Sequence, residues 1–305
     1  MNIAMTNFKF EIPMAPVLAT ALILLALTGC QAEPPAAKFI EQSDRLHNEA
    51  FASTVIADTD LSEYVQLVAD RIAQAAAEVE PARVNADFIA RVRCHLVSCD
   101  TVNVFATGGL HVYVFNGLFQ QCQSEEELAA AIAHAYAHLV HRDLEQTKMQ
   151  PDPRMGISLV VWDLVANRFD LAKEHEADEL AVRIFARAGW DPKRFPLLFE
   201  HLESVSGGNV APDRLLLPAR ASVLSDEAAE AHQTARILPV ADPRTFISLR
   251  KHAAQFHEPP GPLLPYLYLR AIPNCMLSGD DALQREAQER LRPRLPAPVQ
   301  TLEPN

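Results

Sequence analysis

Two histidines four residues apart, His134 and His138, are the residues of this chain whose spacing points most directly to metal chemistry. Residues four apart on an α-helix lie about 40° apart around the axis and roughly 6 Å apart along it, so two imidazoles can bind the same ion. Position 135 projects beside them and holds an alanine. A methyl group can neither accept a proton nor hold a water molecule by a hydrogen bond. The stretch therefore predicts a metal-binding helix without a proton acceptor at this position.

In the H-E-x-x-H helix of zinc peptidases, the glutamate takes a proton from the attacking water. Here that glutamate is replaced by Ala135. General-base assistance contributes about 10²–10⁴-fold to a rate. We therefore expect zinc binding with impaired hydrolysis, unless a nearby group such as Tyr136, His175 or Glu176 acts as a substitute base. The alternative is that both histidines are core residues that bind no metal.

The helix that carries these histidines is signalled by its own sequence. Ser124, with Glu127 three residues later, forms a capping box. Apolar residues then recur at helical spacing, namely Leu128, Ala131, Ile132, Tyr136 and Leu139. His141 shares the face of the two histidines but lies about 4.5 Å beyond His138 along the axis, so we treat it as a bystander.

A second segment, Glu174-His175-Glu176-Ala177-Asp178, follows further along the chain. With the two histidines, it resembles the zinc metallopeptidases of metallopeptidase family 48, which includes the HtpX, BepA and CaaX prenyl protease enzymes. The resemblance implies that Glu174 is the third ligand of one Zn²⁺ ion. It also implies that Asp178, one helical turn later, orients a ligand histidine. Two imidazoles and a carboxylate form an ordinary three-ligand zinc site with a fourth position for water.

The resemblance extends over roughly residues 58–200 and includes a strand before the zinc helix. Residues 103–109, Asn-Val-Phe-Ala-Thr-Gly-Gly, are similar to a family strand whose edge pairs with extended substrate. The resemblance therefore implies substrate-binding roles for Asn103, Phe105, Gly108 and Gly109. An exposed strand edge offers unpaired amides to an extended peptide. The alternative is a hairpin that belongs to the core.

Two further features depart from the family pattern. The segment between His138 and Glu174 is shorter than we expect for relatives. A family T-H-P segment is replaced by Leu-Ser-Asp-Glu at residues 224–227, where His232 is the candidate substitute.

The N-terminus predicts export. Lys9 precedes an apolar run at residues 17–27, which is too short for a comfortable membrane span and suits a signal sequence. Leu27-Thr28-Gly29-Cys30 then resembles a bacterial lipobox, in which Cys30 receives the lipid. Gln31 is compatible with sorting to the outer membrane of a Gram-negative bacterium. We predict a periplasmic protein attached to the membrane only through this lipid, with an uncleaved anchor as the alternative.

Four cysteines remain after Cys30, an even number that suits an oxidising compartment. We prefer the pairs Cys94 with Cys99 and Cys122 with Cys275, although three connectivities are possible and free thiols are the alternative.

Composition limits the partners. The net charge of -12 argues against nucleic acid. We instead expect extended or unfolded polypeptide as the partner.

The expected fold is α+β and predominantly helical, a zincin-type metallopeptidase domain with a small β-sheet beside the zinc helix and a helical C-terminal extension. We assign residues 1–29 to a lipoprotein signal peptide, 30–50 to a tether, 51–240 to the metallopeptidase-like domain and 241–305 to a helical region with a disordered tail. A long helix is expected to end near Pro81, strands to follow at residues 86–92 and 102–114, and helices to follow Pro192 and to span 245–256 and 280–291.

Three functions are compatible with these features. The first is an exported lipoprotein with a family 48 scaffold, impaired in hydrolysis, that binds peptides or acts in envelope quality control. The second is an active zinc metalloendopeptidase with a substitute base. The third is a structural lipoprotein without metal.

Overall fold

The computed structural model describes residues 37–143, 171–205, 216–239, 242–273 and 282–294. The lipobox with Cys30, Cys275 and the C-terminal tail lie outside these residues, so the predictions made for them are not tested. Within them, no helix is both long and apolar enough to span a membrane.

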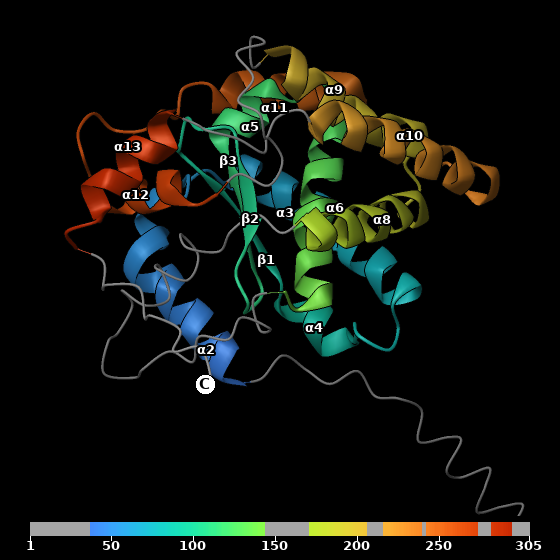
Figure 1. Cartoon of the computed structure of the whole chain (residues 1–305), viewed down its shortest axis with the longest axis horizontal. Helices are drawn as coiled ribbons and strands as arrows, with labels where there is room; N and C mark the ends of the chain where they lie inside the picture. Colours follow the sequence, from blue (N-terminus) through green and yellow to red (C-terminus); the bar gives the residue numbers. More distant parts are fainter. Residues whose placement is uncertain (1–36, 144–170, 206–215, 240–241, 274–281, 295–305) are drawn as a thin grey trace, which may run out of the picture.

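A three-stranded sheet lies at the centre of the molecule (Figure 1). Its strands are β1 (Arg93–Val97), β2 (Val104–Ala106) and β3 (His111–Phe115), in the order β1-β3-β2. β3 pairs in parallel with β1 and antiparallel with β2. All five residues of β3 are buried, because both faces of the sheet are covered.

The two faces of the sheet belong to two different apolar layers. Val112 and Val114 pack into the larger layer, which includes residues of α3 (Thr59–Val79) and α6 (Glu125–His141). Tyr113 and Phe115 point to the other face, since side chains alternate along a strand. There they meet a smaller layer that includes η1 (His47–Phe51), α12 (Leu264–Ala271) and α13 (Ala282–Leu291).

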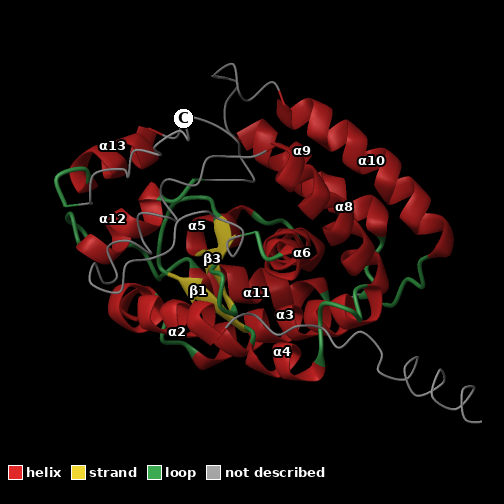
Figure 2. Ribbon diagram, turned by 60° about the horizontal axis from the view of Figure 1, so that its bottom comes forward, coloured by secondary structure: helices red, strands yellow, loops and turns green. Residues whose placement is uncertain are grey.

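Helix α6 lies between the sheet and the helices that follow it. It packs against β2, against α8 (Leu171–Arg187) and against α9 (Phe195–Val205), and α10 (Leu216–Thr234) covers α8 and α9 from outside. Figure 2 shows α6 nearly along its axis, with the strands on one side and α8 and α9 on the other. The remaining elements are α2 (Ala37–Leu46), η2 (Ala52–Thr54), α4 (Ala86–Arg91), α5 (Asn116–Gln121), η3 (Pro192–Arg194) and α11 (Pro243–Ala253).

The predicted fold class is confirmed: the protein is predominantly helical, with a small sheet beside the helix that bears His134 and His138. The long first helix, the helix after Pro192 and the two C-terminal helices are present near their predicted positions as α3, α9, α11 and α13. The strand predicted at 102–114 is instead the hairpin of β2 and β3.

The prediction of a strand at residues 86–92 is wrong, because this segment forms helix α4. Asn85 caps that helix, with its side-chain oxygen accepting a hydrogen bond from the Phe88 N–H at 2.8 Å. Only Phe88 of the helix is buried, and the strand β1 begins after it.

Part of the segment assigned to a tether is structured. Helix α2 begins at Ala37, and Leu46 and Ala50 are buried in the smaller apolar layer. Ser43 of α2 hydrogen bonds to Thr107 in the turn between β2 and β3. The packed part of the chain therefore begins earlier than residue 51.

The preferred disulfide between Cys94 and Cys99 is not formed. Both cysteines are free and buried, as is Cys122. β1 is extended through Val97, so Cys94 and Cys99 are separated by strand rather than brought together by a turn. Cys94 belongs to the larger apolar layer and Cys99 to the smaller one, so the two side chains lie on different faces of the sheet.

Candidate metal centre

Helix α6 begins as its sequence predicts. The Ser124 side chain accepts a hydrogen bond from the Glu127 N–H at 3.4 Å, and the Glu127 carboxylate accepts one from the Gln123 N–H at 2.8 Å. Almost every residue of the helix is buried, and many of them are alanines. Small side chains allow α3, α8 and α9 to pack closely around it.

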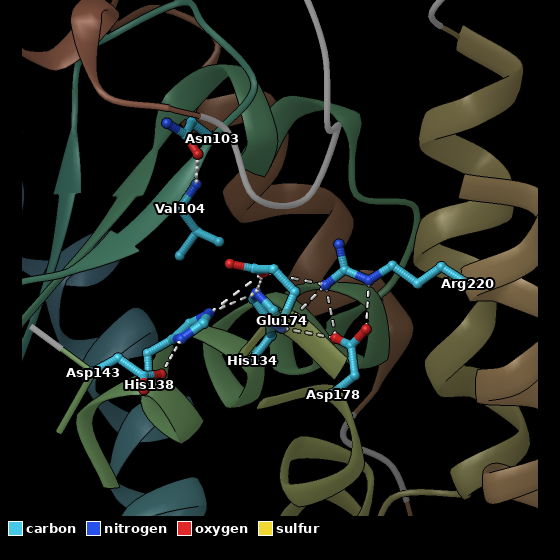
Figure 3. Close-up of polar contacts among 8 residues, drawn as sticks. All are labelled: Asn103, Val104, His134, His138, Asp143, Glu174, Asp178 and Arg220. Carbon is cyan, nitrogen blue, oxygen red and sulfur yellow. Dashed lines mark hydrogen bonds and ion pairs between the residues drawn. The ribbon is translucent and has the colours of Figure 1, made fainter. Parts of the chain in front are cut away.

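The packing of α6 against α8 brings the three predicted ligands together. Nε2 of His134 lies 3.3 Å from Nε2 of His138. Oε2 of Glu174 lies 3.2 Å from the first nitrogen and 3.5 Å from the second. These three side chains, which we call the α6–α8 cluster, meet near the end of β2 in Figure 3.

The spacing of these donor atoms fits a zinc ion. Zn–N and Zn–O bonds are about 2.0–2.1 Å long, so two ligands of a tetrahedral ion lie about 3.3 Å apart. The three measured separations of 3.2–3.5 Å match this value. In addition, Glu174 Oε2 is buried without a hydrogen bond of acceptable geometry, which is costly unless a cation supplies the missing interaction.

The other ring nitrogens of both histidines are held by carboxylates. Nδ1 of His134 lies 2.8 Å from Oδ1 of Asp178, and Nδ1 of His138 lies 2.7 Å from Oδ2 of Asp143. An Nδ1–H that donates to a carboxylate leaves the lone pair of Nε2 directed at the cluster. Two lone pairs and a carboxylate oxygen then face one another, which is the donor arrangement that a metal cation binds.

Arg220 of α10 completes the surroundings of Asp178. Its Nη2 donates to Asp178 Oδ1 at 2.8 Å and lies 3.6 Å from Glu174 Oε2. The guanidinium also lies over the Phe199 ring, 4.8 Å from its centroid. Arg220 therefore connects α10 to the two acidic residues of α8.

Both acidic residues are kept ionised by these contacts. Burial acts to raise the pKa of Glu174, but in the metal-free protein the adjacent His134 and His138 outweigh burial, because a proton on either ring stabilises the carboxylate, and the pKa lies below its usual value. Burial likewise acts to raise the pKa of Asp178, and hydrogen bonds from Arg220 and His134 outweigh it. The carboxylates are thus anionic at neutral pH, as metal binding and histidine orientation require.

None of the three residues considered as a substitute base lies in the cluster. Tyr136 is fully buried and packs edge-on against Phe88, and burial raises the pKa of its hydroxyl. His175 is exposed and pairs with Glu179 on the same helix, while Glu176 is exposed and lies 3.8 Å from His141. Position 135 itself is a buried alanine.

His141 and His232 also lie apart from the cluster. His141 contacts Glu176 through Nδ1, as expected of a bystander. His232 of α10 instead contacts Asp191 beside η3, with Nδ1 and Oδ1 2.8 Å apart.

Strand β2 runs beside α6 at the edge of the described sheet. The Phe115 N–H donates to the Asn103 carbonyl and the Thr107 N–H to the His111 carbonyl. Because hydrogen bonding alternates along an antiparallel strand, the backbone groups of Val104 and Ala106 point away from β3. Figure 3 shows the Val104 side chain directed toward the cluster.

The four residues predicted to bind substrate do not converge on the cluster. The Asn103 side chain is buried and accepts a hydrogen bond from the Val104 N–H at 2.9 Å. Phe105 packs on the other face of the sheet against Tyr113. Gly108 is half-buried, and a Cβ on Gly109 would overlap Ser43 of α2. A substrate role for this strand therefore depends on its backbone, and it stays a prediction.

The sequence reasoning missed Asp143 and Arg220. Asp143 follows the last turn of α6, after Arg142 in the left-handed conformation, which turns the chain back toward His138. An acidic residue just after the second histidine was the available signal. No comparable signal marked Arg220, because its contact depends on how α10 packs on α8.

Part of the chain resembles known proteins. Residues 62–160 match the model of Peptidase family M48. This part of the chain is thus similar to peptidase family M48. The M48 match contains β1–β3 and α6 with both histidines, and it ends before Glu174.

Several relatives were found among curated proteins. The beta-barrel assembly-enhancing protease of Yersinia pestis is 28% identical over 166 residues, which cover 46% of this chain and 34% of that protein. Its counterpart in Escherichia coli strain K12 is 27% identical over 165 residues, covering 45% and 34%. The mitochondrial metalloendopeptidase OMA1 of Schizosaccharomyces pombe is 26% identical over 129 residues, covering 37% and 38%. The matches thus span about a third of the length of the bacterial relatives.

Proposed function

We propose that this protein binds one zinc ion through His134, His138 and Glu174, and that it uses its M48 scaffold to bind extended polypeptide with strongly reduced hydrolysis. The observation that carries the proposal is the triangle of donor atoms 3.2–3.5 Å apart beside a buried alanine at position 135. The metal ligands of a peptidase are thus retained without the residue that removes a proton from water.

Each residue of the centre has a separate role in this proposal. Zinc, when bound, would act as a Lewis acid that polarises a carbonyl group and acidifies water. Asp178 and Asp143 hold the histidines with Nε2 toward the ion. Arg220 neutralises part of the negative charge of Glu174 and Asp178.

Polypeptide binding is proposed along β2. The backbone of Ala106 points away from β3 at the edge of the described sheet, which suits the addition of a strand there. The proximity of β2 to α6 would place that added strand beside the α6–α8 cluster. The name of the bacterial relatives, beta-barrel assembly-enhancing protease, supports unfolded or assembling envelope proteins as the partners.

A position in the bacterial envelope follows from the same relatives and from the N-terminal sequence. We propose that Cys30 is lipidated and anchors the protein in the periplasm at the outer membrane. Metabolic labelling with a fatty acid would test this directly, because the Cys30→Ala protein should lose the label.

The test of the reduced hydrolysis is the substitution Ala135→Glu in the full chain. We expect the zinc-loaded variant to cleave unfolded casein roughly 10²–10⁴-fold faster than the wild type, since a general base is restored. Ala135→Gln is the matched control, because it adds nearly the same volume without a base. It should bind zinc and remain as slow as the wild type.

The other two functions predict different results. A wild-type protein that already cleaves casein as fast as Ala135→Glu would establish an active peptidase with a substitute base. A wild-type protein that binds no zinc at the α6–α8 cluster would contradict the proposal and favour a structural lipoprotein. If Ala135→Glu binds zinc and is inert, the missing base does not by itself account for the reduced hydrolysis.

A further inference from the structure

A second group of histidines lies on the opposite face of the sheet from α6. It consists of His47 on η1, His95 on β1 and His111 on β3, and we call it the sheet cluster. His95 pairs in register with Tyr113, whose side chain belongs to the smaller apolar layer. The sheet cluster therefore shares no residue with the α6–α8 cluster and is separated from it by the sheet.

The three imidazoles are close enough to share one ion. One ring nitrogen from each residue lies within 4.8 Å of one from each of the others. Nε2 of His95 and Nδ1 of His111 are 2.8 Å apart. The His47 ring lies 4.4 Å from the His95 ring and 4.7 Å from the His111 ring, measured between centroids.

Two neighbouring side chains hold the outer nitrogens of the sheet cluster. Nε2 of His111 lies 2.9 Å from Oδ1 of Asp44, and Nδ1 of His47 lies 3.0 Å from the Tyr113 hydroxyl. An imidazole whose outer nitrogen donates to such a partner directs the lone pair of its other nitrogen inward. This is the same arrangement of carboxylate and histidine that Asp178 forms with His134.

The surroundings favour neutral rings and still allow an ion to enter. Burial, reinforced by the neighbouring His47 and His111, lowers the pKa of His95 to about 3. Burial also lowers the pKa of His111, against the opposing effect of Asp44. His47 and His95 are only part-buried, so the cluster is reachable from solvent.

We propose that His47, His95 and His111 form a second metal site that binds a divalent transition-metal ion of the zinc class. Three neutral imidazoles are suitable ligands for zinc, copper or nickel, whereas calcium and magnesium require oxygen ligands. Asp44 and Tyr113 orient two of the three ligands.

Binding requires His47 to turn, because its ring is stacked on those of His95 and His111, with interplanar angles of 22° and 10°, and the lone pairs of stacked rings do not converge on one point. Two ligands of a tetrahedral zinc ion lie about 3.3 Å apart, so the nitrogens of His95 and His111 must separate by about half an ångström. With Nε2–H of His111 directed at Asp44, Nε2–H of His95 donates to Nδ1 of His111. His95 must therefore move this proton from Nε2 to Nδ1 before its Nε2 can bind a metal. No net change in the number of protons is needed.

The experiment uses zinc and the full chain with the α6–α8 cluster disabled by His134→Ala and His138→Ala. This background separates the second site from the proposed function, since of the two proposed sites the sheet cluster alone keeps its ligands. Isothermal titration with Zn²⁺ should find one equivalent bound. Adding His95→Ala should remove it, while adding His257→Ala, which changes an exposed histidine beside Asp100, should leave it intact.

A second variant keeps the proposal falsifiable if His95→Ala does not fold. Asp44 is half-exposed, so Asp44→Asn should fold, and it should weaken zinc binding roughly 10–100-fold by releasing His111. A background protein that binds no zinc would overturn the proposal. Zinc binding that is unchanged by Asp44→Asn or by a folded His95→Ala would also overturn it.

Discussion

The α6–α8 cluster and the sheet cluster place similar side chains on opposite faces of one sheet, but they differ in what holds them together. In the α6–α8 cluster, Nδ1 of each histidine is hydrogen-bonded to a carboxylate. The two Nε2 atoms and Oε2 of Glu174 are 3.2–3.5 Å apart. In the sheet cluster, two inner nitrogens approach to 2.8 Å and share a proton. The first is arranged for a cation, whereas the second is stable through its own hydrogen bond until a cation replaces it.

Charge separates the two clusters further. Glu174 contributes a negative charge to the α6–α8 cluster, whereas the sheet cluster offers only imidazoles as ligands. A dication in the first site is partly neutralised, while in the second it keeps its full charge close to an apolar layer. We therefore expect the α6–α8 cluster to bind zinc more tightly.

The largest expected effect is the loss of the tighter zinc site in His138→Ala. Removing a ligand should weaken binding there by more than the roughly 100-fold that loss of an orienting partner causes. A competition titration with a chelating dye should show two steps for the wild type and only the weaker one for His138→Ala. The comparison is wrong if His95→Ala, and not His138→Ala, removes the tighter step.

The next largest effect is a difference between Asp178 and Asp44, the carboxylates that orient a histidine in each cluster. It is measured as the change in the free energy of unfolding of the metal-free protein when each is replaced by asparagine. Asp178→Asn removes the charge that faces Arg220, and both side chains are nearly buried. Leaving the Arg220 guanidinium buried without its partner should lower the free energy of unfolding by about 3 kcal/mol or more.

Asp44→Asn is the matched control, since Asp44 is half-exposed and should contribute less than about 1 kcal/mol. Urea denaturation of both variants measures the difference. Equal losses of stability would contradict the distinction drawn between the buried and the exposed carboxylate.

A smaller, pH-dependent effect is expected at Glu227 of α10, outside both clusters. Burial, with Glu179 nearby, raises the pKa of Glu227 to about 7. The folded state therefore holds its proton more tightly than the unfolded chain, whose glutamate has a pKa of about 4.3. The contribution of Glu227 to the free energy of unfolding should thus fall as pH rises from about 4 to about 7.

Glu227→Gln should remove this loss of unfolding free energy and stabilise the protein at pH 8 by about 1 kcal/mol. The expected value is small because the side chain is partly exposed and solvent screens its charge. Glu230→Gln, on the exposed side of the same helix, is the control. A difference in stability between the wild type and Glu227→Gln that is constant from pH 5 to pH 8 would contradict the raised pKa.

The meeting of His134, His138 and Glu174 was predictable because its signals are local in the sequence. Ser124 and the apolar spacing predict α6, and its helical geometry aligns His134 with His138. The motif around Glu174 supplied the remaining ligand and Asp178. In contrast, α4 was predicted as a strand, since its few apolar residues fit either periodicity and the cap at Asn85 was overlooked.

The sheet cluster was not predictable in the same way. His47, His95 and His111 belong to three separate elements, and each is an isolated histidine in its own segment. They meet because β1 pairs with β3 in one register and η1 packs on that face. A shift of one residue in either strand would turn its histidine to the other face. Arg220 was missed for the same reason, as its partners are set by helix packing.

Anomalous diffraction at the zinc edge, from crystals of the wild-type protein grown with zinc, tests the central claim most directly. The account predicts a peak about 2.0–2.1 Å from Nε2 of His134, Nε2 of His138 and Oε2 of Glu174. A map without zinc between these three atoms, in a protein folded as described, would contradict it.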